Sequence, residues 1–335
     1  MAVAAFVAVP LTEPEAAVTE LAALARAIRA LPGVVAKADI GLVAEVFGAG
    51  DWYAGPGDDG AVLPAGEGQV VVGGEAMLPA FVAADPYGAG VAAVLANVND
   101  LAAMGARPVA LLDTIVGPRD VAREALRGMQ WAGHTYDVPI VGGHLTINAG
   151  PPSLSAFGIG RADRVLSAGN ARAGHALILG CCLDGAMRSD FLFFKSFEQR
   201  GDRLAGDVRL LADLATSGAV RAAKDVSMAG LVGSLAMLLE PGRLGVTVDL
   251  DLLPVPDGVP LADWLGCFPC FAFVLTTTQD QVSACIAGFR ERGLTAAVLG
   301  VLDDSGLVRL RQGGDTGDTV GVFDLNREGV TNLHG

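Results

Sequence analysis

The stretch Asn97-Val-Asn-Asp100-Leu-Ala-Ala-Met-Gly105-Ala closes a long predicted helix. Asp85 can cap the first turn of this helix, Pro86 fits its first position, and Gly105 can end it. At 100° per residue, Asn97 and Asp100 lie one turn apart and off the apolar stripe, beside small alanines. Two interpretations are open: a face that a ligand approaches closely, or an ordinary exposed face. An exposed face normally carries Lys, Glu or Arg, and this helix has none.

A pair of adjacent carboxylates lies upstream, in the glycine-rich loop at 48–60, where the sequence reads Gly-Asp58-Asp59-Gly-Ala. Adjacent carboxylates repel each other and are tolerated when solvent surrounds them or when a cation lies between them. Asp-Gly is also a common turn dipeptide, so a solvated turn and a metal-binding loop both fit. Glu75, which follows an apolar strand, either joins such a metal site or points to solvent.

Two further motifs place glycine or charge where an anion could bind. Gly142 and Gly143 follow an apolar strand and His144 comes next, so backbone N–H groups and an imidazole are available to a phosphate or a proton. Lys224 and Asp225 precede a predicted helix, whose N-terminus suits a phosphate. The alternatives are a strand-end turn for the first motif and an ordinary helix cap for the second.

Helix-like and strand-like periodicities alternate along the chain, which is typical of an α/β or α+β fold. Predicted helices cover 13–30, 42–47, 85–104, 118–136, 202–217, 226–239 and 279–292, and predicted strands cover 61–63, 69–73, 109–116, 139–141, 154–160, 176–181, 245–250, 271–277 and 296–301. A chain of 335 residues favours two domains. A polar segment at 164–174 marks their boundary, which gives an N-terminal domain at 1–168 and a C-terminal domain at 169–335.

The composition limits the partners of the protein. Its formal net charge is −14, so it repels phosphate backbones, and nucleic acid is not an expected partner. A triphosphate can still bind when magnesium lies between its oxygens and protein carboxylates. No apolar run reaches about 18 residues, which predicts no membrane span. The five cysteines lack the regular spacing of a disulfide framework, and a reducing cytoplasm fits them.

In order and spacing, the four motifs resemble one superfamily: aminoimidazole ribonucleotide synthetase, thiamine-monophosphate kinase, selenophosphate synthetase and the hydrogenase-maturation dehydratase. The similarity covers roughly residues 35–310, and the helix motif ending in Ala-Ala-Met-Gly-Ala is its most specific part. The segment at 169–179 is similar to the inter-domain segment of that superfamily. The sequence looks closest to the aminoimidazole ribonucleotide synthetase-related branch.

The resemblance implies an N-terminal α/β domain whose strands pair across a homodimer in a barrel-like sheet. It also implies a C-terminal α/β domain that closes a site for ATP and Mg²⁺. We therefore expect the metal at Asp58, Asp59, Asp100 and Glu75, the nucleotide at Asn97, Gly142, Gly143 and Lys224, and catalytic proton transfer at His144 and Asp225.

The sequence departs from the pattern of the superfamily at two positions. Members such as the thiamine-monophosphate kinases usually carry Asp where this chain has His144, and a second glycine where it has Ala229. These changes bear on the reaction more than on the nucleotide site. The change at His144 leaves open a non-catalytic nucleotide-binding or assembly subunit. A small-molecule-binding protein without a nucleotide stays open only if the acidic loop lies far from the face of Asn97 and Asp100.

The expected chemistry is ATP-dependent phosphoryl transfer to an oxygen of a small molecule, or ATP-driven activation of a carbonyl or amide oxygen. Catalysis would come mainly from positioning and charge neutralisation. The segment 184–201 is the expected substrate-specific part, and its basic residues, such as Arg188 and Lys195, suggest an anionic substrate.

Overall fold

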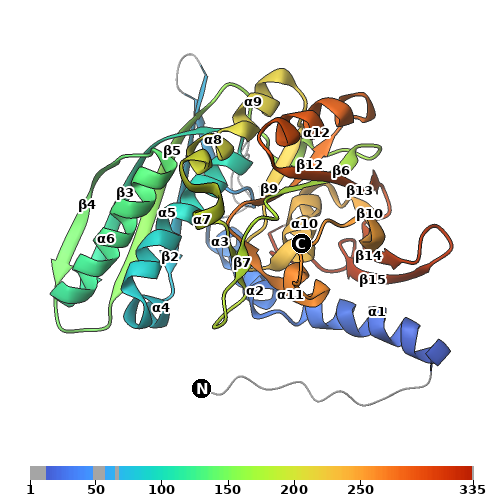
Figure 1. The fold of residues 1–335 in the computed structure, drawn as a ribbon, viewed down its shortest axis with the longest axis horizontal. Coiled ribbons are helices and arrows are strands. Elements are labelled where there is room, and N and C mark those ends of the chain that lie inside the picture. The colour runs from blue at the N-terminus through green and yellow to red at the C-terminus, as the bar shows by residue number, and fades with distance from the viewer. Residues whose placement is uncertain (1–12, 48–56, 65–67, 334–335) are drawn as a thin grey trace.

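The computed structural model describes residues 13–47, 57–64 and 68–333 and shows a mixed α/β fold (Figure 1). Within these ranges the strands form sheets of five, seven and three strands. The predicted fold class is therefore confirmed. Most of the predicted glycine-rich loop lies outside the described residues, at 48–56. None of the described helices is long and apolar enough to cross a membrane.

The first sheet has the strand order β1-β2-β5-β3-β4. Its strands are β1 (Ala61–Pro64), β2 (Gln69–Met77), β3 (Arg107–Gly117), β4 (Ile140–Ile147) and β5 (Ser153–Ala162). Only β3 and β4 run parallel, because α6 (Arg119–Tyr136) crosses back between them. Alternate residues of β5 are buried on the side of α5 (Pro86–Ala103), and the residues between them lie on the opposite, open face.

Two glycines permit a close crossing of α5 and α6. A Cβ added at Gly90 would lie 2.0 Å from the carbonyl oxygen of Ala125, and one added at Gly128 would lie 2.0 Å from that of Tyr87. Each helix therefore presents bare backbone to the other. This crossing fixes the position of α5, the helix that ends in the motif around Asp100.

The second sheet has the order β15-β14-β10-β13-β6-β12-β9. Its strands are β6 (Ala176–Cys181), β9 (Ala222–Asp225), β10 (Gly245–Asp249), β12 (Ala272–Thr277), β13 (Thr295–Asp303), β14 (Leu307–Gln312) and β15 (Asp318–Asp324). Every residue of β6 and β12 is buried, which explains their continuous apolar sequence. Alternate residues of β6 join different cores, because α10 (Gly230–Leu239) and α12 (Val282–Glu291) cover opposite faces.

The remaining elements connect and flank these sheets. The small sheet consists of β7 (Ala186–Met187), β8 (Phe193–Lys195) and β11 (Phe268–Pro269). The other helices are α2 (Pro32–Val35), α3 (Gly41–Phe47), α4 (Pro79–Ala84), α7 (Phe197–Arg200), α8 (Leu204–Asp207), α9 (Leu210–Ser217) and α11 (Leu261–Gly266), with 3-10 helices at Ala36–Ile40, Ala168–Asn170, Gly201–Arg203, Glu240–Gly242, Leu250–Leu252 and Gln279–Gln281. The helix predicted at 202–217 is thus three shorter pieces, and β14 and β15 were not predicted.

Helix α1 (Glu13–Arg29) lies along the second sheet, beside β14 and β15 (Figure 1). Its buried residues Leu21, Ala25 and Ile28 keep helical spacing and join the apolar core of that sheet. Helix α1 was assigned to the N-terminal domain at 1–168, but it packs on the second sheet. An amphipathic helix packs on any apolar face that can cover its buried side, even one formed by residues far away in the sequence. The boundary after residue 168 stays a prediction.

One apolar core crosses from the first sheet to the second. Val94 of α5 and Leu211 of α9 belong to the same buried cluster as Phe271 beside β12. The side-chain amide of Asn99 also donates a hydrogen bond of 3.2 Å to the carbonyl oxygen of Cys270. Helix α5 therefore packs against both halves of the chain.

The predicted helix at 226–239 begins later than expected. Lys224 and Asp225 end strand β9, which pairs with β12, and the N–H of Val226 extends this pairing by donating to the carbonyl oxygen of Ala272 at 2.9 Å. α10 begins only at Gly230, whose φ of 68° suits glycine. Lys224 and Asp225 are thus strand residues, and neither caps the helix.

We predict that Gly90→Ala lowers the apparent free energy of unfolding by about 2 kcal/mol, although alanine is the better helix former. The reason is that the new methyl group must push α6 away from α5. Urea unfolding checks this, with Gly321→Ala on β15 as the control, because a Cβ at Gly321 meets nothing within 4 Å. Equal stabilities for the two variants would contradict the close crossing.

Candidate functional site

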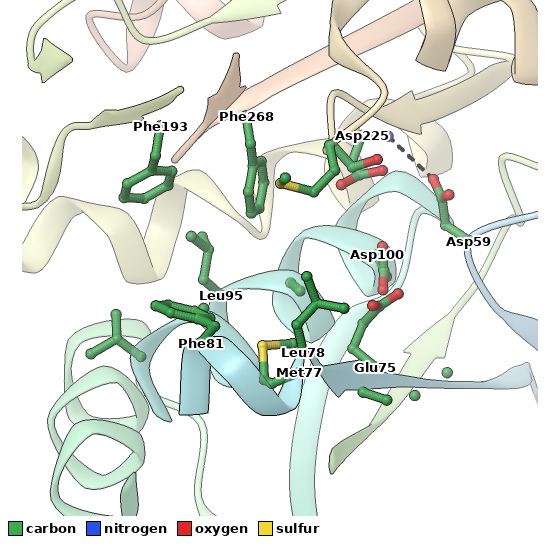
Figure 2. A pocket seen from close by; sticks show the side chains of 18 of the residues that line it. Asp59, Glu75, Met77, Leu78, Phe81, Leu95, Asp100, Phe193, Asp225 and Phe268 are labelled. Atoms are coloured by element: carbon green, nitrogen blue, oxygen red, sulfur yellow. Dashed lines mark hydrogen bonds between the residues drawn. The ribbon is translucent and has the colours of Figure 1, made fainter. Parts of the chain in front are cut away.

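Three carboxylates converge between the two large sheets. Asp59 precedes β1, Asp100 lies near the end of α5, and Asp225 ends β9. One oxygen of each lies within 4.8 Å of one oxygen of both others. Figure 2 shows the three side chains directed toward a common space. The structure thus brings together two residues that the sequence analysis assigned to the metal and one that it assigned to proton transfer.

Helix α5 places Asp100 at the end of a row of small residues. Gly88, Ala92 and Ala96 precede it at four-residue intervals, and all four line one cavity. Residues four apart share a helix face, so this face leaves open space beside the carboxylate. Asp100 itself is only 8% exposed.

Lys224 is the buried cation of the cluster. Its ammonium group forms a salt bridge with Asp59 and lies 4.0 Å from the nearest carboxylate oxygen of Asp225. Burial alone lowers the pKa of Lys224, but the charges of Asp59 and Asp225 outweigh burial and raise that pKa above its usual value. The lysine therefore stays charged. The backbone N–H of Asp225 also donates to Asp59, at 3.2 Å.

One lysine does not balance three carboxylates. Burial is the largest cause that raises the pKa of Asp100 well above its usual value, and the charges of Asp225, Asp59 and Glu75 raise it further. Burial, followed by the charge of Asp59, raises the pKa of Asp225 to about 7. The cluster therefore binds protons unusually tightly, and a divalent cation would relieve the same repulsion.

Glu75 and Lys37 stand at the edge of the cluster and line the same cavity. Burial raises the pKa of Glu75, the charge of Lys37 lowers it, and the charge of Asp59 raises it. Sequence reasoning missed Lys37, which lies in the 3-10 helix at Ala36–Ile40. In the sequence, only the positive charge of Lys37 could have indicated a role in the site, because this residue lies in none of the four motifs.

Asp58 lines the cavity but turns toward the segment between the two sheets. Its two carboxylate oxygens accept hydrogen bonds of 2.7 Å from the hydroxyl of Ser167 and the N–H of Ala168. Burial raises the pKa of Asp58, and these two bonds lower it. Asp58 is outside the three-carboxylate group, and its contacts tie the acidic loop to the inter-domain segment.

Asn97 lies apart from the cavity. Its amide nitrogen donates to the carbonyl oxygens of Ala93 at 2.9 Å and of Ala156 at 3.2 Å, so the side chain is buried between α5 and β5. The cavity face of α5 runs through Ala96 and Asp100, and Asn97 is turned about 100° from Ala96. The predicted nucleotide contact of Asn97 stays a prediction that this placement does not favour.

Gly142, Gly143 and His144 lie on the edge strand β4, also outside the cavity. A Cβ at Gly143 would lie 2.6 Å from the carbonyl oxygen of Asp113, so packing within the sheet explains this glycine. His144 is exposed, and its Nε2 lies 3.2 Å from the hydroxyl of Thr146. Within one chain these three residues therefore do not meet the carboxylates.

The carboxylates occupy one end of a large cavity between the two halves of the chain. The cavity measures about 1260 Å³ and is lined by residues of β2, α4, α5, β8 and β11 among others. Its acidic end offers several hard oxygen atoms, the ammonium group of Lys224 and, at the edge, that of Lys37. Such an end can hold a divalent cation together with the phosphates that the cation binds.

The fold and this cluster define a two-domain α/β protein with an acidic site between its domains. The chain belongs to the AIR synthase related family. Residues 57–162 match the family model "AIR synthase related protein, N-terminal domain", and residues 184–312 match the corresponding C-terminal domain. The resemblance inferred from the four motifs is therefore confirmed.

Relatives extend over most of the chain. An uncharacterized protein of Synechocystis sp. is 33% identical over 263 residues, which cover 78% of this chain and 82% of that protein. The phosphoribosylformylglycinamidine synthase subunit PurL of Synechococcus sp. is 26% identical over 315 residues, covering 84% of this chain and 40% of PurL.

Solved structures share the fold. T. maritima PurL complexed with ADP superimposes with a TM-score of 0.69 at 22% identity, covering 80% of this chain and 46% of PurL. AaThiL complexed with AMPPCP and TMP gives a TM-score of 0.64 at 17% identity, covering 84% of this chain and 95% of AaThiL. The chain thus spans about half the length of the PurL chain and nearly all of AaThiL.

We predict that the metal-free protein loses stability as the pH rises from about 5.5 to 8. Asp225 binds its proton more tightly in the folded than in the unfolded chain, so it stabilises the fold at low pH, and this contribution is lost as the pH approaches about 7. Thermal melts in a chelator check this. Asp225→Asn should flatten the slope, while Asp315→Asn at an exposed carboxylate should keep it. Parallel curves for Asp225→Asn and the wild type would contradict the shifted pKa.

Proposed function

We propose that the protein is an enzyme that binds Mg²⁺ and ATP at the carboxylate cluster and uses ATP on an oxygen of a small molecule. The observation that supports this most is the convergence of Asp59, Asp100 and Asp225 around Lys224, from three separate parts of the sequence. Carboxylate oxygens are the protein ligands that magnesium prefers, so the residues present fit that ion.

The side chains of the cluster would have different roles. Asp59 and Asp100 would hold the metal, with Glu75 beside them, and Lys224 would pair with phosphate oxygens. Magnesium, when bound, would neutralise charge on the triphosphate. Asp58 would orient the acidic loop through Ser167 instead of contacting the metal.

Asp225 would accept the proton of the reacting group. Its pKa of about 7 suits a general base near neutral pH. In a phosphoryl transfer, the substrate hydroxyl would form the new bond to the γ-phosphorus, the bond from that phosphorus to ADP would break, and the hydroxyl proton would pass to Asp225. In the alternative reaction, a carbonyl or amide oxygen would take the phosphoryl group and be activated for attack.

Members of the same fold support the nucleotide part of this proposal. T. maritima PurL was solved with ADP, and AaThiL was solved with AMPPCP and TMP. Both are under 25% identical to this chain, so they support a nucleotide site but leave the reaction open. The five cysteines are free and buried, which supports a reducing compartment such as the cytoplasm.

A homodimer is part of the proposal, and the open face of the first sheet supports it. Phe157 on this face of β5 is 44% exposed, and the bulged residue Val109 of β3 is 47% exposed. Such apolar side chains in the middle of a sheet favour a covering partner. Because His144 and its two glycines lie outside the cavity, any contact between them and the nucleotide would have to come from a partner copy.

The position of His144 also favours a second candidate, a non-catalytic nucleotide-binding or assembly subunit. That candidate predicts nucleotide binding with no turnover. Sustained ATP hydrolysis that disappears in Asp100→Asn would exclude it.

We predict that Mg²⁺ and ATP together raise the Tm of the protein by about 5 °C at a hundredfold excess over Kd. Asp100→Asn should reduce this rise to below about 1 °C, because it removes a proposed metal ligand without changing the shape of the side chain. The matched control is Asp113→Asn, a buried carboxylate of β3 outside the cavity, which should keep the full rise. A wild-type protein that shows no rise with Mg²⁺ and ATP would refute the proposed function.

We predict that Phe157→Arg converts the protein from a dimer to a monomer, because a charge on the open face cannot be buried against a second copy. Sedimentation velocity measures the change. Leu126→Arg, at an exposed position on the opposite side of the sheet, should leave the dimer intact. A wild-type protein that sediments as a monomer at micromolar concentration would contradict the homodimer.

A further inference from the structure

The cavity continues beyond the carboxylates into a second compartment. Its total volume of about 1260 Å³ exceeds the roughly 300–1,000 Å³ that one small ligand usually fills. Six aromatic side chains line this part, which we call the aromatic compartment: Phe81, Trp131, Phe191, Phe193, Phe197 and Phe268. Figure 2 shows Phe81, Phe193 and Phe268 at the opposite end of the cavity from Asp59 and Asp100.

Rings from both halves of the chain build the wall of this compartment. Trp131 of α6 meets Phe197 edge to face at 5.3 Å, and Phe81 of α4 meets Phe191 in the same manner at 6.0 Å. The wall still leaves apolar surface uncovered, since Trp131 is 39% and Phe191 is 36% exposed. A flat apolar ligand would bury this surface, at about 25 cal/mol for each Å².

The basic residues of this region already have carboxylate partners. Arg188 donates to Asp190 at 2.8 and 2.6 Å, and its guanidinium lies 4.6 Å from the ring centre of Phe191. Lys195 donates to Glu198 at 3.3 Å. An anionic ligand would compete with these carboxylates for Arg188 and Lys195. The pairing therefore argues against the anionic substrate expected from the sequence.

We propose that the aromatic compartment binds the second substrate of the enzyme, and that this substrate is an uncharged, largely apolar molecule with a flat ring. Its oxygen function would point along α5 toward the carboxylates. Ala92, beside the compartment, and Asp100 are eight residues apart, a span of about 12 Å on a helix. The inference rests on the proposed function, because it assigns the acidic end of the cavity to Mg²⁺ and ATP.

Two probes of the same shape test the charge of the ligand. Calorimetric titration of the full-length protein with 2-naphthylmethanol should show saturable binding, and 2-naphthoate should bind at least tenfold more weakly. Binding of the alcohol should persist in saturating Mg²⁺ and AMPPCP, since the two ligands would occupy different ends of the cavity.

A filling substitution tests the location. Ala92→Trp should weaken binding of 2-naphthylmethanol at least tenfold, because the indole would occupy the compartment. Ala284→Trp, at an exposed position on α12, should bind the alcohol as the wild type does. A thermal melt with Mg²⁺ and ATP, run on both variants, shows whether the fold and the acidic end are intact.

Four outcomes would overturn the inference: no binding of the alcohol to the wild type, unchanged binding in Ala92→Trp, equal or tighter binding of 2-naphthoate, or competition between the alcohol and Mg²⁺–AMPPCP. Competition would assign the compartment to the base of the nucleotide. If the alcohol binds at this compartment but Mg²⁺ and ATP give no thermal shift, the nucleotide proposal fails while the ligand class stands.

Discussion

The repulsion among three buried carboxylates is the constraint on which the site depends. With an effective dielectric constant near 20, two charges at the 4.8 Å limit that encloses Asp59, Asp100 and Asp225 repel by roughly 3 kcal/mol. Lys224 offsets part of this repulsion, and protons or a cation must offset the rest. The fold thus gives up stability at one place, which is the usual sign of a functional site.

Separate parts of the fold hold the three carboxylates in place. The close crossing of α5 and α6 at Gly90 and Gly128 fixes Asp100, and pairing with β12 fixes Asp225. Asp59 is held by Lys224, while its neighbour Asp58 bonds to the inter-domain segment through Ser167 and Ala168. A movement of one half of the chain against the other would therefore change the spacing of the carboxylates. Under the proposed function, metal binding would therefore depend on the relative position of the two halves.

Much of the fold could be predicted from local pattern. The cap at Asp85 and the stop at Gly105 predicted α5 to within a residue or two, and the side chain of Asp85 accepts from the N–H of Gly88 as a cap does. The predicted start of α10 at residue 226 was wrong, because Lys224 and Asp225 pair with β12. This pairing is a tertiary contact that helical periodicity does not report. The packing of α1 on the second sheet was also not predicted, because it too is a tertiary contact that local periodicity does not report.

The site residues, like the fold, could be predicted only as far as local sequence patterns determine them. Spacing in sequence grouped Asp59 with Asp100, but it also assigned ligand roles to Asp58 and Asn97, whose side chains turn to Ser167 and to β5. Orientation was the missing information, since a one-residue step on α5 turns a side chain by about 100°. The aromatic compartment was predicted only in part. Phe191, Phe193 and Phe197 lie in the segment 184–201 that the sequence marked as substrate-specific. The rings of Phe81, Trp131 and Phe268 come from α4, α6 and β11, and no motif links these elements to that segment.

The most direct measurement is a crystal structure of the protein grown with Mn²⁺ and AMPPCP, with anomalous diffraction used to locate the metal. The proposed site predicts a manganese peak in contact with carboxylate oxygens of Asp59 and Asp100 and with phosphate oxygens of the analogue. A peak bound elsewhere, or a nucleotide whose phosphates lie away from these carboxylates, would contradict the account.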